Sequence, residues 1–158
     1  MFLIFANDDL IDNPGAIDAA IGHLISRKYI GIVGAQLHTS TGNLAHAVIH
    51  FTAYGPPCHQ PEHCAPCDHV ASARERLIPA VIGAFFTMHR LKFLQIKLTE
   101  SFNICGEDIL LSLQTRERLN KQVLYCPTMR GIHDAESTRS KFEQLQENAD
   151  DMKRMRTS

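Results

Sequence analysis

FLIFANDDL, residues 2–10, is the stretch on which the fold assignment depends, because apolar residues run directly into an amide and two carboxylates. A short apolar run bounded by turn-forming residues is typical of a strand covered on both faces, as in a parallel sheet, although a piece of buried helix has the same pattern. In open α/β sheets, ligands bind beyond the carboxyl ends of the strands. Asn7, Asp8 and Asp9 therefore lie either at a ligand-binding edge or in an ordinary loop that leads into a helix.

The composition sets the class of protein. A length of 158 residues corresponds to one domain with one core. The formal net charge of -1 provides no field that would favour nucleic acid or anionic lipid, so no nucleic-acid partner is expected. The sequence contains neither a membrane-length apolar run nor a secretory signal, and we expect a cytoplasmic protein with no membrane span. Five cysteines, an odd number, favour thiols or metal ligands over a complete disulfide framework.

The segments that follow the first strand predict an α/β order. Residues 11–28 predict an amphipathic helix with Asp12 or Asn13 as its N-cap. YIGIVGAQL, 29–37, predicts a second buried strand, and LAHAVIHF, 44–51, predicts a further strand. Strand, helix and strand in this order are typical of a right-handed crossover unit.

The second half of the chain predicts fewer regular elements. They are a long loop from Gly55 to about Arg76, a buried strand at 77–90, a helix from Glu107 to about Asn120, a short strand at 121–127 and a polar loop at 128–140. We expect one domain over residues 1–140. Residues 141–158 predict a charged tail that is either helical or disordered.

Three acidic residues and one histidine stand at positions that suggest catalytic chemistry. Glu107 and Asp108 open a helix, where carboxylates either cap the free amide groups or act as a base. Asp9 ends a predicted strand and His133 follows another, so these side chains face one crevice if the strands run in parallel. A carboxylate at a strand end, a carboxylate base and an imidazole together suit metal-assisted transfer from a phosphorylated donor.

The order of motifs resembles a known family. FANDDL, GIVGAQL, GNLAHAVIHF, IPAVIGAFFTMHRLKF, ESFNICGEDILLSLQTR and VLYCPTMRGIHDAESTRS are similar in order to the second half of a family 2 glycosyltransferase. The similarity covers Phe2 to about Ser140. It implies a partial GT-A-like (Rossmann-like) mixed α/β sheet flanked by helices. It also implies metal-dependent, inverting transfer of a sugar from a nucleotide-diphosphate sugar to a hydroxyl of a glycan or another acceptor.

The resemblance implies a metal and diphosphate site. Asn7, Asp8 and Asp9 match the Asp-x-Asp type motif of the family, with Asp9 as the ligand of Mn²⁺ or Mg²⁺ and Asp8 assisting in substrate binding. His133 resembles a late histidine that contributes to the metal site. Arg139, in the same late segment, resembles a residue that contacts the diphosphate.

The resemblance also implies a catalytic side. Gly83 and Ala84 match the strand that lines the sugar and acceptor region, and Glu107 and Asp108 match a Glu-Asp helix start that supplies the base, which we assign to Asp108. Glu100 alone survives from an acceptor-side acidic motif. An aspartate common after the Glu-Asp pair is replaced by leucine.

The nucleoside-binding strands, which precede the metal motif in the family, have no counterpart in this sequence. We therefore expect a fragment, one half of a split enzyme or a degenerate relative, with little activity of the chain alone. We also expect another chain, or the missing N-terminal half, to cover the apolar sheet edge. The alternative function is a non-catalytic, truncated GT-A-like binding module that docks on a partner chain.

Cysteine and histidine crowd into the loop at residues 55–76. Cys58, His63, Cys64 and Cys67 include a C-x-x-C spacing that is typical of zinc sites, but only one such pair is present. The segment therefore either holds a structural Zn²⁺ or is a loop with incidental thiols. His46 and His59 also resemble histidines of some family members, which would place His59 at the active cleft.

Overall fold

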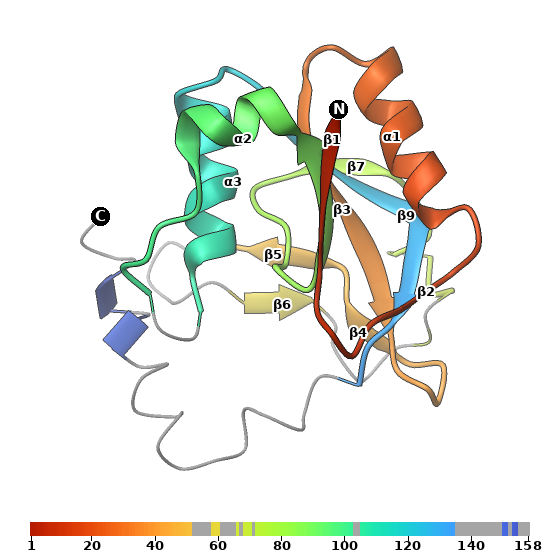
Figure 1. The fold of residues 1–158 in the computed structure, drawn as a ribbon. Helices are drawn as coiled ribbons and strands as arrows, with labels where there is room; N and C mark the ends of the chain where they lie inside the picture. The colour runs from red at the N-terminus through yellow and green to blue at the C-terminus, as the bar shows by residue number, and fades with distance from the viewer. Residues whose placement is uncertain are drawn as a thin grey trace.

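The computed structural model describes residues 1–51, 58–60, 66, 68–70, 72–102, 105–134, 150–151 and 153–154, and for 58–60 it describes the backbone alone. The architecture is mixed α/β (Figure 1). The main sheet has seven strands, β1 (Phe2–Ala6), β2 (Ile11–Asp12), β3 (Ile30–His38), β4 (Leu44–His46), β7 (Arg76–Ile78), β8 (Phe85–His89) and β9 (Gln122–Ile132). Two short strands, β5 (Val48–His50) and β6 (Cys58–Gln60), form a separate sheet. The helices are α1 (Ala16–Ser26), α2 (Arg90–Ile96) and α3 (Glu107–Glu117).

The main sheet is mixed and has the order β1-β8-β3-β9-β2, with β4 added on β3 and β7 on β9. β8 is antiparallel to both β1 and β3, whereas β9 is parallel to β3. Consequently β1, β3 and β9 all point in one direction, and β8 points in the opposite direction. The carboxyl ends of three strands and the start of β8 therefore meet at the same end of the sheet.

β3 is the buried centre of this sheet, as its apolar sequence predicts. Side chains alternate between its two faces: Val33, Ala35 and Leu37 belong to the core cluster that includes Ala16 and Ala20 of α1. Ile32 belongs to the cluster on the opposite face, which includes Leu111 of α3. α1 thus covers one face and α2 and α3 cover the other, with the sheet between them (Figure 1).

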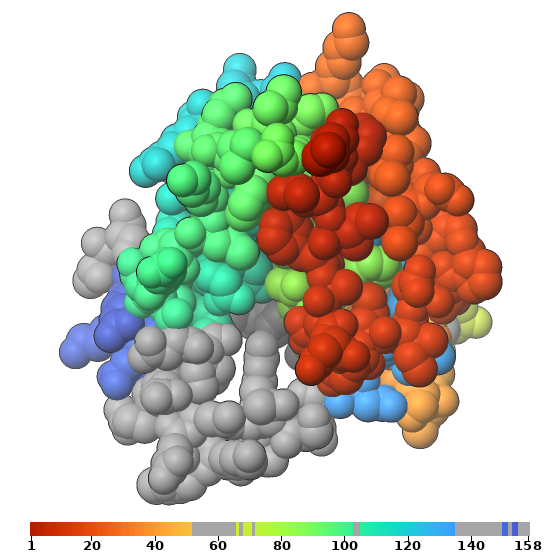
Figure 2. Space-filling view, in the orientation of Figure 1, coloured from red at the N-terminus to blue at the C-terminus, as the bar shows by residue number. Residues whose placement is uncertain are grey.

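β1 forms where FLIFA predicts a strand, but its surroundings correct the expectation of a strand in a parallel sheet covered on both faces. It pairs antiparallel with β8 and lies at the end of the strand order, and Ile4 is 44% exposed. Figure 2 shows β1 and the following turn, in red, on the surface between α1 and the segment of α2. An apolar run alone does not distinguish an edge strand from a central one, because the partner strand lies far along the chain.

α1 begins later than the sequence predicts. Its N-cap is Gly15, with φ 81°, and neither Asp12 nor Asn13 caps it by a side chain. Asp12 instead belongs to β2, which pairs with the end of β9. The backbone N–H of Asn13 donates to Arg130 O at 3.0 Å, so the residues before the helix are held by the sheet.

Two predicted strands are each divided in the structure. LAHAVIHF forms β4 on the main sheet and β5 on the small one, separated at Ala47. The predicted strand at 77–90 forms β7 and β8, and Gly83 and Ala84 lie in the turn that leads into β8. Pro79 follows β7 directly, and proline cannot donate to a strand ladder. The short helix α2, with His89 Nδ1 accepting the Leu91 N–H at its start, was not predicted.

β9 is longer than the predicted strand at 121–127, because it resumes after a bulge. Ala35 pairs with Cys126 and Gln36 pairs with Arg130, so three residues of β9 leave the ladder between them. The first part of the predicted polar loop at 128–140 is therefore strand.

Among the helices of the described residues, none has the length and apolar character needed to cross a bilayer.

Tyr125 of β9 fixes the end of the Cys/His-rich segment to the core. Its hydroxyl donates to Ser72 O at 2.7 Å, and the Gln36 amide donates to the same oxygen at 3.2 Å. Burial raises the pKa of Tyr125 to about 12. The segment that ends at Ser72 is thus anchored on a buried, neutral phenol.

The alkaline stability of the protein should depend on Tyr125. Because its pKa is higher in the folded state than in the unfolded state, its contribution is complete below pH ~10 and is lost as the pH rises through about 12. Between pH 9 and pH 12 the free energy of unfolding of the wild type should fall by up to roughly 3 kcal/mol more than that of Tyr125→Phe. Urea titrations at each pH measure this difference. Tyr29→Phe, at an exposed tyrosine, is the control; equal pH profiles of the wild type and Tyr125→Phe would contradict the assignment.

Candidate active site

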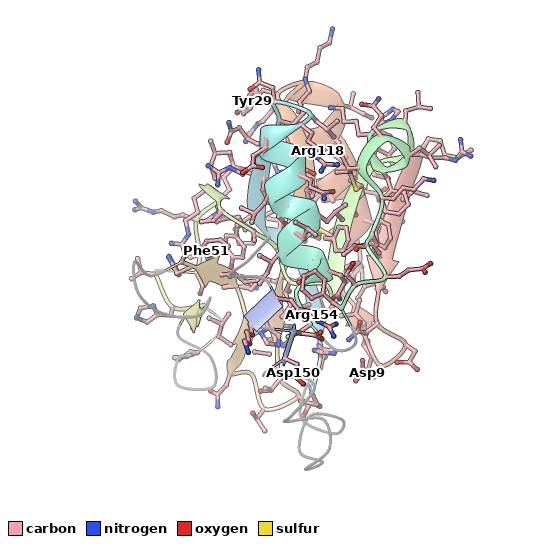
Figure 3. The ribbon with its side chains drawn as sticks, turned by 90° about the vertical axis from the view of Figure 1, so that its left-hand side faces the viewer. Asp9, Tyr29, Phe51, Arg118, Asp150 and Arg154 are labelled. Carbon is pink, nitrogen blue, oxygen red and sulfur yellow. The ribbon has the colours of Figure 1, made fainter. Side chains whose placement is uncertain are left out.

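The residues predicted to carry chemistry gather at one end of the sheet. Asp9 follows β1, His133 follows β9, and Gly83 and Ala84 precede β8, which runs the opposite way. In Figure 3, Asp9 lies at the end of the molecule opposite to Arg118, the residue that follows α3. α3 therefore begins at the same end as Asp9. Strand direction brings together three separate parts of the chain, and the start of α3 adds a fourth.

His133 is the centre of a small polar cluster. Its backbone N–H donates to His38 O at 2.9 Å, which continues the pairing of β9 with β3. Its ring is buried, and Nε2 lies 3.1 Å from Asp9 Oδ1 and 3.1 Å from Asn7 Nδ2. The Asp9 carboxylate is about half exposed. A carboxylate, an amide and an imidazole thus meet at the surface over a buried ring.

The cluster is not satisfied by its own hydrogen bonds. A neutral imidazole nitrogen either donates or accepts, so Nε2 cannot donate to Asp9 and accept from the Asn7 amide together. A half-turn of the Asn7 amide places its oxygen where Nδ2 lies, and His133 Nε2 then has one oxygen of Asn7 and one of Asp9 at 3.1 Å. Adjacent ligands of an octahedral Mg²⁺ ion, with bonds of about 2.1 Å, are about 3 Å apart. The spacing of Asp9 Oδ1 and His133 Nε2 fits this geometry.

In the described part of the chain, no group of three or more His, Cys, Asp or Glu side chains is arranged to hold a metal ion. Only two members of the cluster are of those types, because the third is Asn7. His133 Nδ1 has no hydrogen-bond partner among the described residues, and the His46 ring lies 6.1 Å away, centroid to centroid.

Asp134 fixes the backbone that carries His133. The backbone N–H of Ser40 donates to Asp134 Oδ1 at 2.9 Å, and this hydrogen bond holds the pKa of Asp134 below its ordinary value. The turn after β3 and the end of β9 are therefore tied by an ionised carboxylate. Asp134 was not predicted as a site residue, because an exposed aspartate after a strand has no distinctive sequence pattern.

Asp108 holds the turn at Gly83 against the start of α3. Its Oδ2 accepts the Gly83 N–H at 2.6 Å, and its Oδ1 accepts the Ile109 N–H at 2.7 Å. A Cβ added to Gly83 would lie 3.3 Å from Asp108 Oδ2 and 3.5 Å from Glu107 Oε1. Both carboxylates at the helix start thus face a backbone position that has no side chain.

A backbone hydrogen bond joins the two parts of the site. The Asn7 N–H donates to Ala84 O at 3.0 Å, beyond the last pair of the β1–β8 ladder. A chain of contacts therefore runs from Asp108 through Gly83 and Ala84 to Asn7, and from there to His133 and Asp9.

Not every predicted site residue joins this group. Asp8 is exposed in the turn beside Asp9, and Glu100 is exposed in the segment between α2 and α3, where no contact links it to the cluster in the described residues. Arg139, His63, Cys64 and Cys67 lie outside the described residues. For Cys58 and His59 only the backbone is described: they pair with His50 and Ile49 in the small sheet.

The tail makes two contacts that its sequence does not predict. Its described residues are helical in backbone, and Asp151 is fully buried, accepting the Cys105 N–H at 3.2 Å. Arg154 donates to Ser101 O at 2.6 Å. Figure 3 shows Arg154 and Asp150 at the end of the molecule where α3 begins. The tail therefore packs against the segment that leads into α3.

The assignment of a function to this protein rests on the geometry described above. No protein-family model matches the sequence, and no curated protein matches it.

Proposed function

We propose that this protein is a metal-dependent glycosyltransferase, or the catalytic half of one, that uses a nucleotide-diphosphate sugar as donor. The observation that carries the proposal is the meeting of Asn7, Asp9 and His133 at 3.1 Å contacts, one chain of hydrogen bonds away from Asp108. An unsatisfied set of ligand atoms beside a carboxylate at a helix start is the pair of features that diphosphate transfer requires.

Asp9 and His133, with the oxygen of Asn7, would hold the divalent cation, Mn²⁺ or Mg²⁺. The cation, when bound, neutralises the charge that grows on the departing diphosphate. Asp9 supplies a negative charge at the surface, and the buried His133 fixes the position of the site against the sheet. Asp8, in the same exposed turn, would contact the diphosphate from the solvent side, together with Arg139.

Asp108 would act as the base in an inverting transfer. It would take the proton of the acceptor hydroxyl as that oxygen attacks the anomeric carbon, while the bond to the diphosphate breaks. A side chain at Gly83 would press against both Asp108 and Glu107, so glycine at this position keeps the two carboxylates clear of a neighbouring side chain. Glu107 would position the acceptor, and Glu100 would contact it from the segment before α3.

A partial GT-A-like fold is part of the same proposal. Three strands that point one way, an acidic turn after the first of them and an antiparallel β8 beside it support a partial GT-A-like sheet. In the described residues the outer edge of β1 has no strand partner. We propose that a further strand or a second chain covers this edge.

Two further expectations belong to the proposal. The protein acts in the cytoplasm, and the Cys58–Cys67 segment holds a structural zinc ion.

A non-catalytic binding module is the competing proposal. It is favoured by Asp108, because both of its carboxylate oxygens accept backbone N–H groups in the way a purely structural aspartate does. In that case Asn7, Asp9 and His133 would form a polar contact without affinity for a cation. Metal binding therefore separates the two proposals.

Mn²⁺ should bind to the protein, and should in turn promote binding of a nucleoside diphosphate. Asp9→Asn and His133→Gln should each weaken Mn²⁺ binding by roughly 100-fold, since the first removes the anionic ligand and the second the imidazole ligand, and changes to groups that merely support metal ligands already cost about 10- to 100-fold. Titration of free Mn²⁺ by electron paramagnetic resonance measures the affinity, and calorimetry with a panel of nucleoside diphosphates measures the coupling.

Asp12→Asn is the matched control for this experiment. It removes the same charge from an exposed aspartate three positions along the chain, in β2, and should leave Mn²⁺ affinity unchanged. Equal Mn²⁺ affinity in the wild type and Asp9→Asn, or diphosphate binding that ignores Mn²⁺, would contradict the proposed function and favour the binding module.

A further inference from the structure

The bulge in β9 creates a second polar feature that the proposed active site does not use. Pro127, Thr128 and Met129 leave the ladder between the pairs Ala35–Cys126 and Gln36–Arg130. Met129 turns into the core and is fully buried, whereas Thr128 is exposed. The bulge therefore presents one polar side chain outward while its neighbour anchors it.

The bulge also orients Arg130. The Nε–H of Arg130 donates to Pro127 O at 2.8 Å, so the side chain folds back across the bulge. A guanidinium has five N–H donors, and this bond uses one of them. In the described part of the chain, neither terminal nitrogen of Arg130 contacts a carboxylate or a carbonyl oxygen. With respect to the described residues, Arg130 is thus a fixed cation with four unused donors at a half-buried position.

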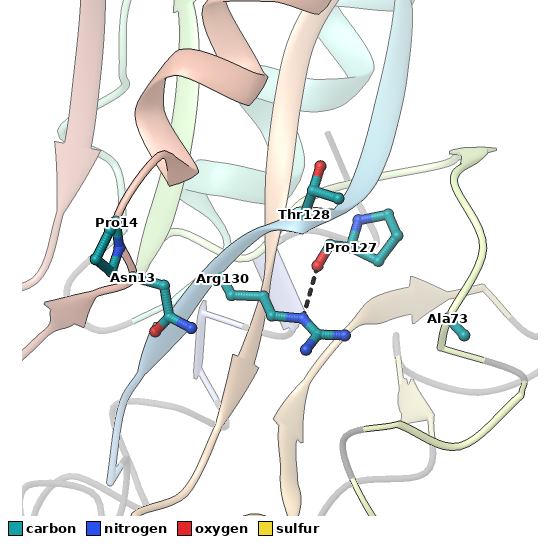
Figure 4. Close-up of a pocket in the computed structure, with 6 residues that line it drawn as sticks. All are labelled: Asn13, Pro14, Ala73, Pro127, Thr128 and Arg130. Atoms are coloured by element: carbon teal, nitrogen blue, oxygen red, sulfur yellow. Dashed lines mark hydrogen bonds between the residues drawn. The ribbon is translucent and has the colours of Figure 1, made fainter.

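These four donors face a pocket. Its volume is about 400 Å³, and it is lined by Asn13, Pro14, Ala73, Pro127, Thr128 and Arg130. Figure 4 shows the guanidinium between Asn13 on one side and Ala73 on the other, with Pro127 and Thr128 above it. The pocket is built from fixed parts, since Asn13 is held to β9 by its own backbone bond to Arg130 O.

We propose that this pocket binds a small organic carboxylate, with Arg130 as the residue that recognises its charge. Nε is occupied by Pro127 O, so the two terminal nitrogens form an end-on fork that matches the two oxygens of a carboxylate. Asn13 lines the same space, and its amide supplies further hydrogen bonds. Thr128 lines it too, with its hydroxyl 3.1 Å from Cys126 Sγ. Pro14, Ala73 and Pro127 provide apolar walls for the body of the ligand.

The charge balance favours a carboxylate over a phosphate. Among the described residues that line this pocket, Arg130 is the one that carries a charge, so it compensates a single negative charge. A phosphate group carries about -1.5 to -2 at neutral pH and would enter with an uncompensated charge. The apolar walls would also gain no contact with inorganic phosphate, whereas they would cover the hydrocarbon part of an organic acid.

Benzoate is the probe, since it combines a carboxylate with an apolar ring that the pocket has room for. In amide-resolved NMR titrations of the whole chain, benzoate should shift the signals of Asn13, Ala73, Thr128 and Arg130, with a dissociation constant on the order of 1 mM. Benzamide, the neutral counterpart, should bind at least about tenfold more weakly, as should inorganic phosphate.

Variants of Arg130 test its role directly. Arg130→Gln should weaken benzoate binding at least about tenfold, and Arg130→Lys at least about fivefold, because lysine keeps the charge without the fork. Arg118→Gln, which removes the same charge from an exposed residue after α3, should leave binding unchanged.

Three results would overturn the proposal. They are the absence of shifts at the pocket amides with benzoate, equal binding of benzoate and benzamide by the wild type, and unchanged benzoate binding by Arg130→Gln. Phosphate binding as tight as benzoate binding would overturn the assignment to a carboxylate. The wild-type comparison of benzoate with benzamide holds even if an Arg130 variant does not fold. None of these outcomes depends on Mn²⁺, so failure here is distinct from failure of the proposed transferase function.

Discussion

Replacing Gly34 with alanine should destabilise the protein by about 3 kcal/mol. A Cβ on Gly34 would lie 2.4 Å from Val81 Cγ1 and 2.9 Å from Val81 Cβ, well inside contact distance. β3 cannot move away, because Gly34 is paired with Phe86 on one side and Tyr125 on the other. Val81 is buried and β-branched, so its side chain has little freedom to turn aside. Urea denaturation measures the loss.

Gly22→Ala is the matched control for this prediction. Gly22 lies in α1, and a Cβ there would meet nothing within 4 Å, so alanine should stabilise the protein by up to about 1 kcal/mol. The double variant Gly34→Ala/Val81→Ala should lose less than the sum of the two single losses, because the second change removes the clash. A loss below 1 kcal/mol in Gly34→Ala would show that the packing of residue 81 on β3 is looser than the structure has it.

Asp108→Asn should lower the rate of sugar transfer, or of donor hydrolysis by water, by at least about 100-fold. The amide cannot accept the proton of the acceptor hydroxyl, so the step that needs a base is lost. Mn²⁺ affinity should be unchanged, since Asp108 contacts Gly83 and Ile109 rather than the cluster around His133. The rate is measured as release of nucleoside diphosphate from a nucleotide sugar, in the presence of Mn²⁺ and of the strand or chain proposed to cover the edge of β1, because little activity is expected of the chain alone.

Asp108 also has a structural role, and the experiment has to separate the two. The amide keeps one oxygen acceptor and loses the other, which should cost about 1–3 kcal/mol of stability. Rates are therefore measured well below the melting temperature of the variant. Glu117→Gln, at the other end of α3, removes the same charge and should keep the wild-type rate. An Asp108→Asn protein that stays folded and retains its rate would exclude Asp108 as the base.

The sequence predicts those elements whose burial pattern is independent of distant partners. β3 reads as a buried strand because it is apolar on both faces, and α1 and α3 read as helices because apolar and polar residues recur at helical spacing. β1 was placed in a parallel sheet because its apolar run resembles that of β3. Its edge position depends on pairing with β8, about 80 residues away, which local pattern does not contain.

Candidate site residues were predictable where strand ends identify them. Asp9 and His133 each follow an apolar strand, and the direction of these strands brings them into contact. Arg130 and Asn13 were not predictable, because their juxtaposition depends on a bulge and on the pairing of β2 with β9. Asp151 was also missed, since a buried carboxylate in a charged tail has no local signature.

The parallel pairing of β3 with β9 determines how late in folding the central sheet can be completed. Ile30 pairs with Gln122, and the most extensive contact between two elements is made by these strands. Loop closure between such distant residues has an entropic cost that must be met before the pair becomes stable, and folding rates fall as contacts become less local. During synthesis the edge of the central strand that β9 covers therefore waits unpaired until β9 has left the ribosome. In this interval β3 is the segment most exposed to misassociation, and chaperone capture of the nascent chain is expected to concentrate there.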